Sequence, residues 1–374
     1  MTMQLWGRAF VRGELRDDTL IIIDGDEIAD VRDAVRRPTN AEPVAGVILP
    51  GFVDVHVHGG AGADFMDATD EAAATVAEFH AKNGTTAMAA TTLSGSRADL
   101  HAAVRAIARA TARPNAAEIC AIHLEGPYIS LHRAGAQDVA SIRPADIHEV
   151  GALIDEAPEL HWMMTVAPEI DGARGLIEHF RDLVLFSIGH TAADYGEAVN
   201  ALEWGALHFT HLFNAMTGLN HREPGVVGAA LVSTKATAEL IADGIHVHPA
   251  VLRVAVQMMP RRIALVTDAV RACGMPEGSY KLYGHDISVQ QGAARLADGT
   301  LAGSTLTMQR AVQNMVELAG LPLETVVPLA TEVPARIVGA RERKGKLMAG
   351  YDADIVVLTE KFEVERVIVR GERL

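Results

Sequence analysis

Two histidines stand two residues apart in a valine-rich stretch, PGFVDVHVHGG, which begins at residue 50. On a β-strand, residues i and i+2 point to the same face. Asp54, His56 and His58 therefore share one face, and the valines point the opposite way. Imidazole nitrogens combined with a carboxylate suit a first-row divalent ion, most simply Zn²⁺. A single His-x-His pair is weak support for a metal site, so other ligands must come from elsewhere in the chain.

The elements that could supply those ligands repeat along the middle of the chain. Short apolar runs alternate with alanine-rich amphipathic stretches, which is typical of parallel βαβ units. Eight such runs predict a (β/α)₈ barrel, a TIM-like α/β fold. The expected strands are 51–58, 85–92, 118–126, 161–169, 182–190, 205–214, 238–246 and 262–269.

Polar residues close most of these runs. Active sites of such barrels form at the carboxyl ends of the strands, so these residues are expected to meet at one rim. Carboxylates and imidazoles gathered there could bind a metal and transfer a proton. Histidines in helical stretches, such as His80 and His101, are expected to have structural roles. The rim candidates are His56, His58, Glu125, Glu169, His190, His211, Asp243, His246 and Asp268.

The two ends of the chain have a different pattern. Residues 1–48 and 341–374 contain short β-branched runs and turns, and each piece is small for an independent domain. We expect them to pair into one small β-sandwich domain. The barrel, residues 49–340, would then be inserted between its two halves.

Composition limits the classes of partner. The 374 residues carry a net charge of −15, which argues against nucleic acid or an anionic membrane as a main partner. Two cysteines predict no disulfide framework. No apolar run is as long as a membrane span, and no secretory signal is recognisable. The cytoplasm is the expected compartment.

Several segments carry a family resemblance. HLEGPYIS, SIGHTAA, THLFNAMTGLNHREPG, ADGIHVHP, VTDA and LAGSTLTM follow the His-x-His stretch in that order. With it, they resemble the N-acetylglucosamine-6-phosphate deacetylase family of the amidohydrolase superfamily. The resemblance implies that Glu125, His190 and His211 bind a divalent metal. It implies that His56 and His58 hold a second metal, as in some members, and that Asp268 is the catalytic acid and base.

The resemblance also implies a substrate and an assembly. The substrate would be N-acetylglucosamine 6-phosphate, deacetylated in amino-sugar catabolism or cell-wall recycling by a homodimer in which some phosphate contacts can cross between subunits. Gln137 stands where some members have a histidine near the substrate carbonyl. The positions implied to contact substrate are Ala136, Gln137, Asn214, Ala215, Arg222, His246, Leu301, Ala302 and Gly303.

Other functions stay open at this point. A deacetylase for the galactose-configured epimer would need only a few different pocket contacts. Another amidohydrolase acting on a small amide is a second possibility, although the expected fourth strand, HWMMTVAPE, lacks the lysine that bridges two metals in hydantoinase-like enzymes. A non-catalytic metal-binding or sugar-phosphate-binding protein is a third, and it would have no need of Asp268.

Overall fold

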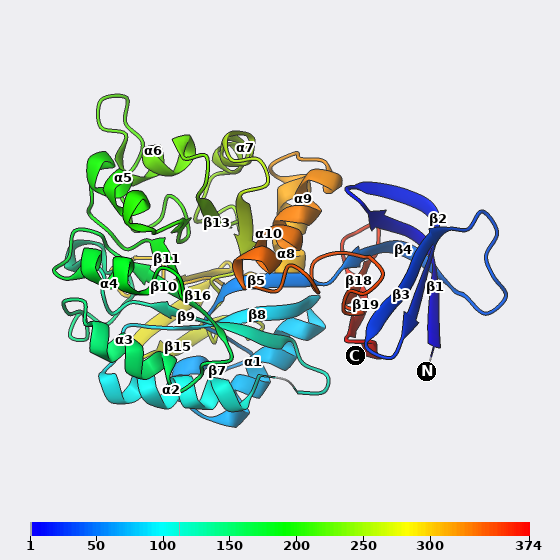
Figure 1. Ribbon diagram of the computed structural model, residues 1–374, viewed down its shortest axis with the longest axis horizontal. Helices are drawn as coiled ribbons and strands as arrows, with labels where there is room; N and C mark the ends of the chain where they lie inside the picture. Colours follow the sequence, from blue (N-terminus) through cyan, green and yellow to red (C-terminus); the bar gives the residue numbers. More distant parts are fainter. Residues whose placement is uncertain (1, 112) are drawn as a thin grey trace.

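The computed structural model describes residues 2–111 and 113–374. Eight parallel strands form a barrel with helices around it, which confirms the predicted fold class (Figure 1). In sheet order the strands are β14 (Ile263–Val266), β13 (Thr237–Ile241), β12 (His208–Phe209), β11 (Val184–Ile188), β10 (His161–Val166), β9 (Glu118–Glu125), β8 (Thr85–Thr92) and β5 (Phe52–Val57).

The barrel closes between its last strand and its first. Val57 pairs in parallel with Ala269, and the backbone N–H of His58 donates to Ala269 O over 2.9 Å. Ring closure leaves no open sheet edge, and it brings the carboxyl ends of all eight strands around one mouth. The helices that cover the barrel are α1 (Asp70–Lys82), α2 (Arg97–Arg109), α3 (Ile147–Ile154), α4 (Ala173–Phe180), α5 (Tyr195–Trp204), α6 (Gly225–Val232), α7 (Pro249–Met258), α8 (Met308–Glu317), α9 (Leu323–Ala330) and α10 (Glu332–Ile337).

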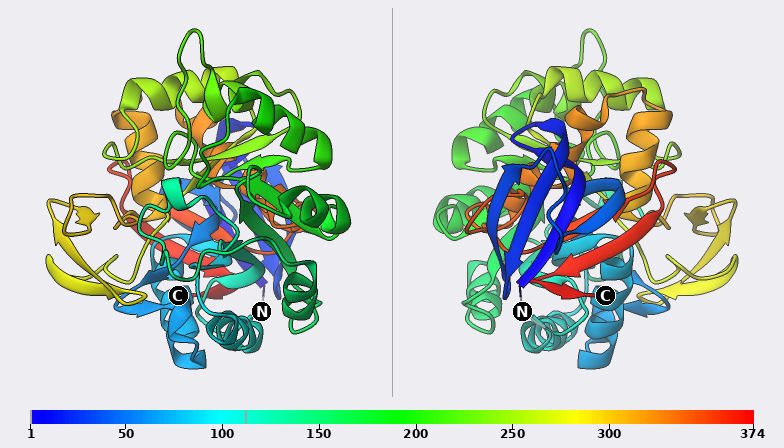
Figure 2. Two further views of the ribbon diagram at one scale, coloured as in Figure 1. Left: turned by 90° about the vertical axis from the view of Figure 1, so that its left-hand side faces the viewer. Right: turned by 90° about the vertical axis from the view of Figure 1, so that its right-hand side faces the viewer.

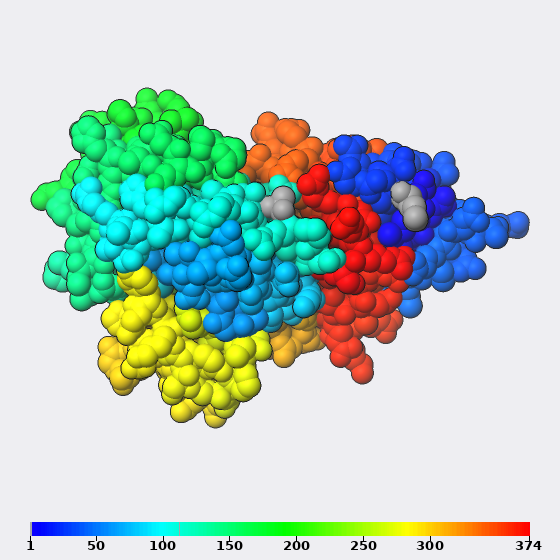
Figure 3. Space-filling view, turned by 90° about the horizontal axis from the view of Figure 1, so that it is seen from below, coloured from blue at the N-terminus to red at the C-terminus, as the bar shows by residue number. Residues whose placement is uncertain are grey.

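Strands from both chain ends build a second domain with its own apolar core (Figure 1, right). Seen from below, the C-terminal residues (red) lie between the barrel and the N-terminal residues (dark blue) in Figure 3. β4 runs on to Pro50, so Gly51 alone separates the two domains there. The division at residues 48 and 341 stays a prediction. The sheet order is β20 (Glu372–Arg373), β19 (Val364–Val369), β18 (Ile355–Leu358), β4 (Glu42–Pro50), β1 (Thr2–Val11), β2 (Glu14–Asp24) and β3 (Glu27–Asp33).

The sequence did not lead us to expect a small antiparallel sheet after the last barrel strand. It consists of β15 (Gly278–Leu282), β16 (His285–Gln290) and β17 (Ala293–Arg295), and it stands out to one side of the barrel (Figure 2). Its core includes Leu282 and Ala302, and the backbone N–H of Ala302 donates to Ala294 O over 3.0 Å. This sheet therefore holds the segment 301–303 beside the barrel mouth.

None of the helices described for this chain combines the length and the apolar character needed to cross a bilayer.

Candidate active site

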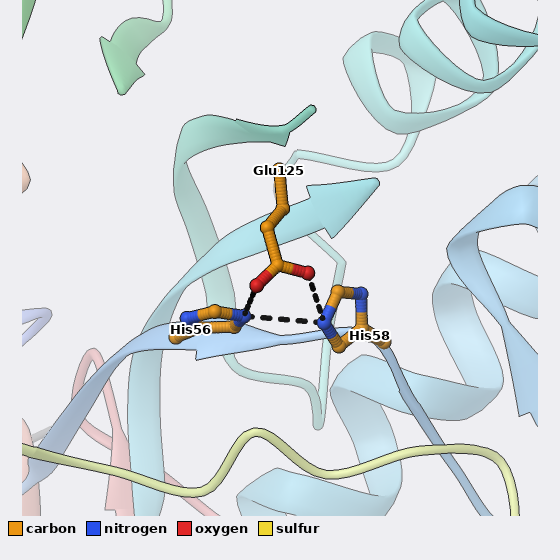
Figure 4. Close-up of side chains that lie close together, drawn as sticks. All are labelled: His56, His58 and Glu125. Atoms are coloured by element: carbon orange, nitrogen blue, oxygen red, sulfur yellow. Dashed lines mark hydrogen bonds and ion pairs between the residues drawn. The ribbon is translucent and has the colours of Figure 1, made fainter. Parts of the chain in front are cut away.

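Five side chains from four strand ends converge at the barrel mouth. Figure 4 shows three of them. His56 of β5 and His58, just after the end of β5, point toward Glu125 at the end of β9. Glu125 Oε1 lies 3.1 Å from His190 Nε2 and 3.0 Å from His211 Nε2. Its other oxygen, Oε2, lies 3.3 Å from His58 Nε2. The fold thus gathers the four predicted histidine ligands around the fifth predicted ligand, the carboxylate of Glu125.

The chain turns sharply just after three of the barrel strands. His190, His211 and Asp268 adopt φ values of 45°, 27° and 49°, in the left-handed region that most side chains avoid. Each such residue costs about 1–3 kcal/mol and persists only where the surrounding structure enforces it. All three side chains lie at the shared mouth. The surrounding structure therefore enforces an unfavourable backbone conformation at three of the groups that could do chemistry.

The donor atoms at the centre fit a metal ion better than they fit one another. His190 Nδ1 lies 2.7 Å from Arg133 O, and a carbonyl oxygen can only accept, so Nδ1 carries the hydrogen. When the ring is neutral, the lone pair of its Nε2 faces His211 Nε2, 3.1 Å away. On the other side, His56 Nε2 and His58 Nε2 are also 3.1 Å apart. Lone pairs facing a carboxylate call for a cation between them.

The electrostatics of the centre agree with that conclusion. Burial lowers the pKa of His58, but Asp268 and Glu125 outweigh burial and raise it to about 9. Burial raises the pKa of Glu125, but His56 and His190 outweigh burial and hold it well below its usual range. The cluster therefore favours positive charge at its centre. Three groups among the described residues satisfy the spacing of a metal site. Glu125–His190–His211 and His56–His58–Glu125 consist of the predicted ligands and share Glu125, and the third is His56–His123–Glu239.

Asp268 lies at the edge of this cluster. Its Oδ1 is 3.2 Å from His58 Nε2 and 3.5 Å from His56 Nε2. Burial raises the pKa of Asp268, but the two histidines outweigh burial and lower it. The carboxylate is therefore ionised and able to accept a proton from a water molecule at the centre.

A cavity of about 450 Å³ opens over the cluster. Most of the predicted substrate positions line it, whereas Ala302 is fully buried in the core beside the small sheet. Arg222 is exposed and lines a separate surface cleft, which also includes Arg133. The predicted positions that do line the cavity are Ala136, Gln137, Asn214, Ala215, His246, Leu301 and Gly303.

Two other predicted rim residues have supporting roles. Asp243 Oδ2 lies 2.6 Å from His246 Nδ1, so it orients a histidine of the cavity wall. Glu169 accepts from Thr191 Oγ1 over 2.5 Å and from the backbone of Ala192 over 2.6 Å, and it fixes the loop after His190. Asp54, deeper in β5, accepts from Thr267 Oγ1 and from the backbone N–H of His56. Its carboxylate therefore fixes the backbone of β5 and does not orient an imidazole ring.

Sequence reasoning missed several residues around the cavity. His132 and Arg133, in the loop after β9, line its wall and bring an imidazole and a guanidinium group there. Glu239 lies in the middle of β13 and is completely buried. A carboxylate inside the apolar run TAELI was a signal that could have identified Glu239. His132 and Arg133 had no comparable signal, because polar residues are ordinary in loops.

Known proteins resemble this chain in sequence and in fold. Residues 47–374 match the model of the amidohydrolase family. An N-acetylgalactosamine-6-phosphate deacetylase of Escherichia coli O157:H7 is 37% identical, over 96% of this chain and 95% of its own. An N-acetylglucosamine-6-phosphate deacetylase of Bacillus subtilis is 39% identical, over 88% of this chain and 85% of its own. A Mycobacterium smegmatis N-acetyl-D-glucosamine-6-phosphate deacetylase, solved with N-acetyl-D-glucosamine 6-phosphate, superposes with a TM-score of 0.94 at 37% identity, covering 100% and 99% of the two chains.

Proposed function

Because the chain belongs to the amidohydrolase family, we propose that it hydrolyses the N-acetyl amide of N-acetylglucosamine 6-phosphate. The products are glucosamine 6-phosphate and acetate. The observation that carries this proposal is the position of Asp268, whose Oδ1 lies 3.2 Å from His58 Nε2 at the floor of the cavity. A site that only bound a metal or a sugar phosphate would have no need of a proton acceptor there.

Glu125, His190 and His211 are the proposed ligands of one divalent metal, and His56 and His58, with Glu125 shared, those of a second. Such a metal, when bound, acidifies a water molecule and polarises an acyl oxygen. We propose Zn²⁺, since imidazole and carboxylate are ligands that it accepts readily. Other first-row ions suit the same ligands, so metal supply in the cell contributes to the choice.

The chain's own part in the chemistry centres on Asp268. Its carboxylate takes a proton from the attacking water as the new C–O bond forms at the acetyl carbon. It then delivers that proton to the amide nitrogen as the C–N bond breaks, because an amine leaves readily only when protonated. The products are acetate and the free amine. The second proton of the water remains on the acetic acid and passes to solvent as acetate forms. One carboxylate thus serves as base and then as acid.

The cavity wall supplies the groups that hold the sugar phosphate. His246, oriented by Asp243, and the side-chain amide of Asn214 line one part of it. Arg133 brings a guanidinium group that suits a phosphate, and His132 adds ring nitrogens that can form hydrogen bonds to it. Binding energy gained at the phosphate, away from the reacting amide, helps to orient that amide against Asp268.

We also propose a homodimer working in the cytoplasm. Arg222 lies outside the cavity of its own chain, so it would meet substrate most simply in the cavity of a partner. Both cysteines, Cys120 and Cys273, are free thiols, which suits a reducing compartment.

The test is acetate release from N-acetylglucosamine 6-phosphate, measured beside the unphosphorylated sugar and the galactose-configured epimer. Rapid release that requires the phosphate would support the proposal. No release from any of the three by protein with verified metal content would overturn it.

One specific observation favours a second candidate. The Escherichia coli relative with 37% identity over 96% of this chain acts, by its name, on N-acetylgalactosamine 6-phosphate. The two sugars differ only in the configuration of one hydroxyl group. A kcat/KM at least tenfold higher for the galactose-configured substrate would transfer the assignment to it and leave the proposed mechanism unchanged.

A further inference from the structure

Glu239 is a buried carboxylate that the mechanism above does not use. It lies on β13, its side chain is completely shielded from solvent, and its ion-pair partners are His56 and His208. An ionised carboxylate in a barrel core costs several kcal/mol unless hydrogen bonds compensate. The partners of Glu239 therefore have to account for its presence.

Three nitrogen atoms surround this carboxylate. Oε2 accepts from the backbone N–H of His211 over 2.9 Å and lies 2.9 Å from His56 Nδ1. Oε1 lies 3.1 Å from His208 Nε2. Since a backbone N–H can only donate, Oε2 is an acceptor, and the hydrogen between it and His56 belongs to the imidazole Nδ1.

This contact determines what the other side of the His56 ring presents. With the hydrogen on Nδ1, the neutral ring has its lone pair on Nε2, which lies 3.4 Å from Glu125 Oε1 and 3.1 Å from His58 Nε2. The ring also packs edge to face against His123, with 4.7 Å between ring centroids. Its orientation is therefore held by packing, and its tautomer is held by Glu239.

We propose that Glu239 is a positioning residue for the metal centre, which keeps the hydrogen of His56 on Nδ1 and so turns the Nε2 lone pair toward the metal. Glu239 can act in this way only if the chain is the metal-dependent hydrolase proposed above. A carboxylate behind a ligating imidazole fixes the tautomer and makes the ligand more basic, and its loss typically weakens metal binding about 10–100-fold.

The experiment titrates Co²⁺ into the metal-free full-length protein and follows binding by calorimetry. Glu239→Met keeps the volume but removes the acceptor, and we expect it to weaken the ion bound through His56 about 10–100-fold. Glu239→Gln keeps an amide oxygen for both N–H groups, and it should bind within about threefold of the wild type. Its amide NH₂ would then face His208, whose Nδ1 can donate to Thr237 Oγ1, 2.6 Å away.

A double-mutant cycle separates this role from general packing. In a His56→Gln background, Glu239→Met should cause no further loss of Co²⁺ affinity at the His56–His58–Glu125 site, because the effect of Glu239 on that site passes through the His56 ring. Asp54→Asn is the matched control, since Asp54 is an equally buried barrel carboxylate that contacts Thr267 and backbone but no imidazole nitrogen. It should bind Co²⁺ like the wild type.

Four results would overturn the proposal. The first is wild-type Co²⁺ affinity in Glu239→Met, and the second is an equal loss of Co²⁺ affinity in Glu239→Met and Glu239→Gln. The third is a loss in the Glu239→Met/His56→Gln double variant that equals the sum of the two single losses. The fourth is a loss in Asp54→Asn as large as that in Glu239→Met. If Glu239→Met fails to fold, Glu239→Asp tests the same point, because the shorter side chain keeps the charge but withdraws the acceptor oxygen from His56. Unchanged Co²⁺ affinity in Glu239→Asp would also overturn the proposal. Acetate release by the wild type tests the hydrolase function separately, because Co²⁺ binding requires no substrate.

Discussion

The side-chain amide of Gln137 donates to Glu125 Oε2 over 2.6 Å, and its oxygen accepts from the backbone N–H of Ser94 over 2.6 Å. A residue of the loop after β9 thus fixes the carboxylate of Glu125, which both sets of predicted metal ligands share. This contact gives Gln137 a positioning role, at a position where some relatives of this chain are expected to place a histidine near the substrate.

We predict that Gln137→Leu lowers kcat/KM about 10–100-fold, with a parallel loss of metal affinity. Leucine fills a similar volume but leaves Glu125 Oε2 without its donor, so the carboxylate is free to rotate away from the metal position. The measurement is acetate release together with metal content after dialysis. A variant with wild-type metal content and wild-type activity would show that Glu125 is held well enough by its histidines.

Asp268→Asn should lower kcat about 10³-fold, because an amide accepts no proton from water at neutral pH. The metal centre should keep its ions, since Asp268 lies at its edge and the five proposed ligands remain. Steady-state rates and metal analysis of the same sample check both parts. A loss of less than tenfold with full metal content would mean that another group moves the proton.

The exposed Arg222 leads to a complementation experiment. Arg222→Ala should raise KM for the phosphorylated substrate and leave the slow reaction of the unphosphorylated sugar unchanged. If Arg222 serves the partner's cavity, mixing this variant with Asp268→Asn should restore about a quarter of the wild-type rate at low substrate. Random exchange makes about half of the dimers mixed, and each mixed dimer has one intact site.

The control for this mixture is each variant alone at the same total concentration. Activity of the mixture equal to the average of the two separate samples would place Arg222 in its own subunit, or outside phosphate binding altogether.

Stability should depend on pH through Glu118, where the barrel meets the terminal domain. Burial raises the pKa of Glu118, but Arg343 and Lys344 outweigh burial and lower it from 4.5 to about 2. A lowered folded-state pKa contributes stability that is present above pH 4.5 and is lost as the pH falls toward 2. Glu118→Gln should therefore reduce the free energy of unfolding by about 3 kcal/mol at pH 7 and by about half as much at pH 3.

Urea denaturation at the two pH values measures this difference. Glu178→Gln is the control, because the Arg174–Glu178 pair is exposed and should contribute less than about 0.5 kcal/mol at either pH. A Glu118→Gln penalty that does not shrink at pH 3 would show that shape, and not charge, accounts for the effect of the substitution.

The sequence by itself determined the barrel and the residues at its mouth. Parallel strands alternate with helices at a spacing that few other folds accommodate, and the carboxyl ends of such strands must meet at one rim. This topology alone requires Glu125, His190, His211 and Asp268 to lie together. The pairing of the two chain ends into one domain followed from the same kind of pattern.

The tertiary structure alone decided which groups touch. Closure of the barrel brings Glu239 on β13 against His56 on β5, and the loop after β9 brings Gln137 back onto Glu125. Strand periodicity says which face a side chain occupies, but not which atom it meets across the barrel. Arg222 lies outside the cavity of its own chain because of the path of a loop. A loop has no sequence periodicity from which that path could be predicted.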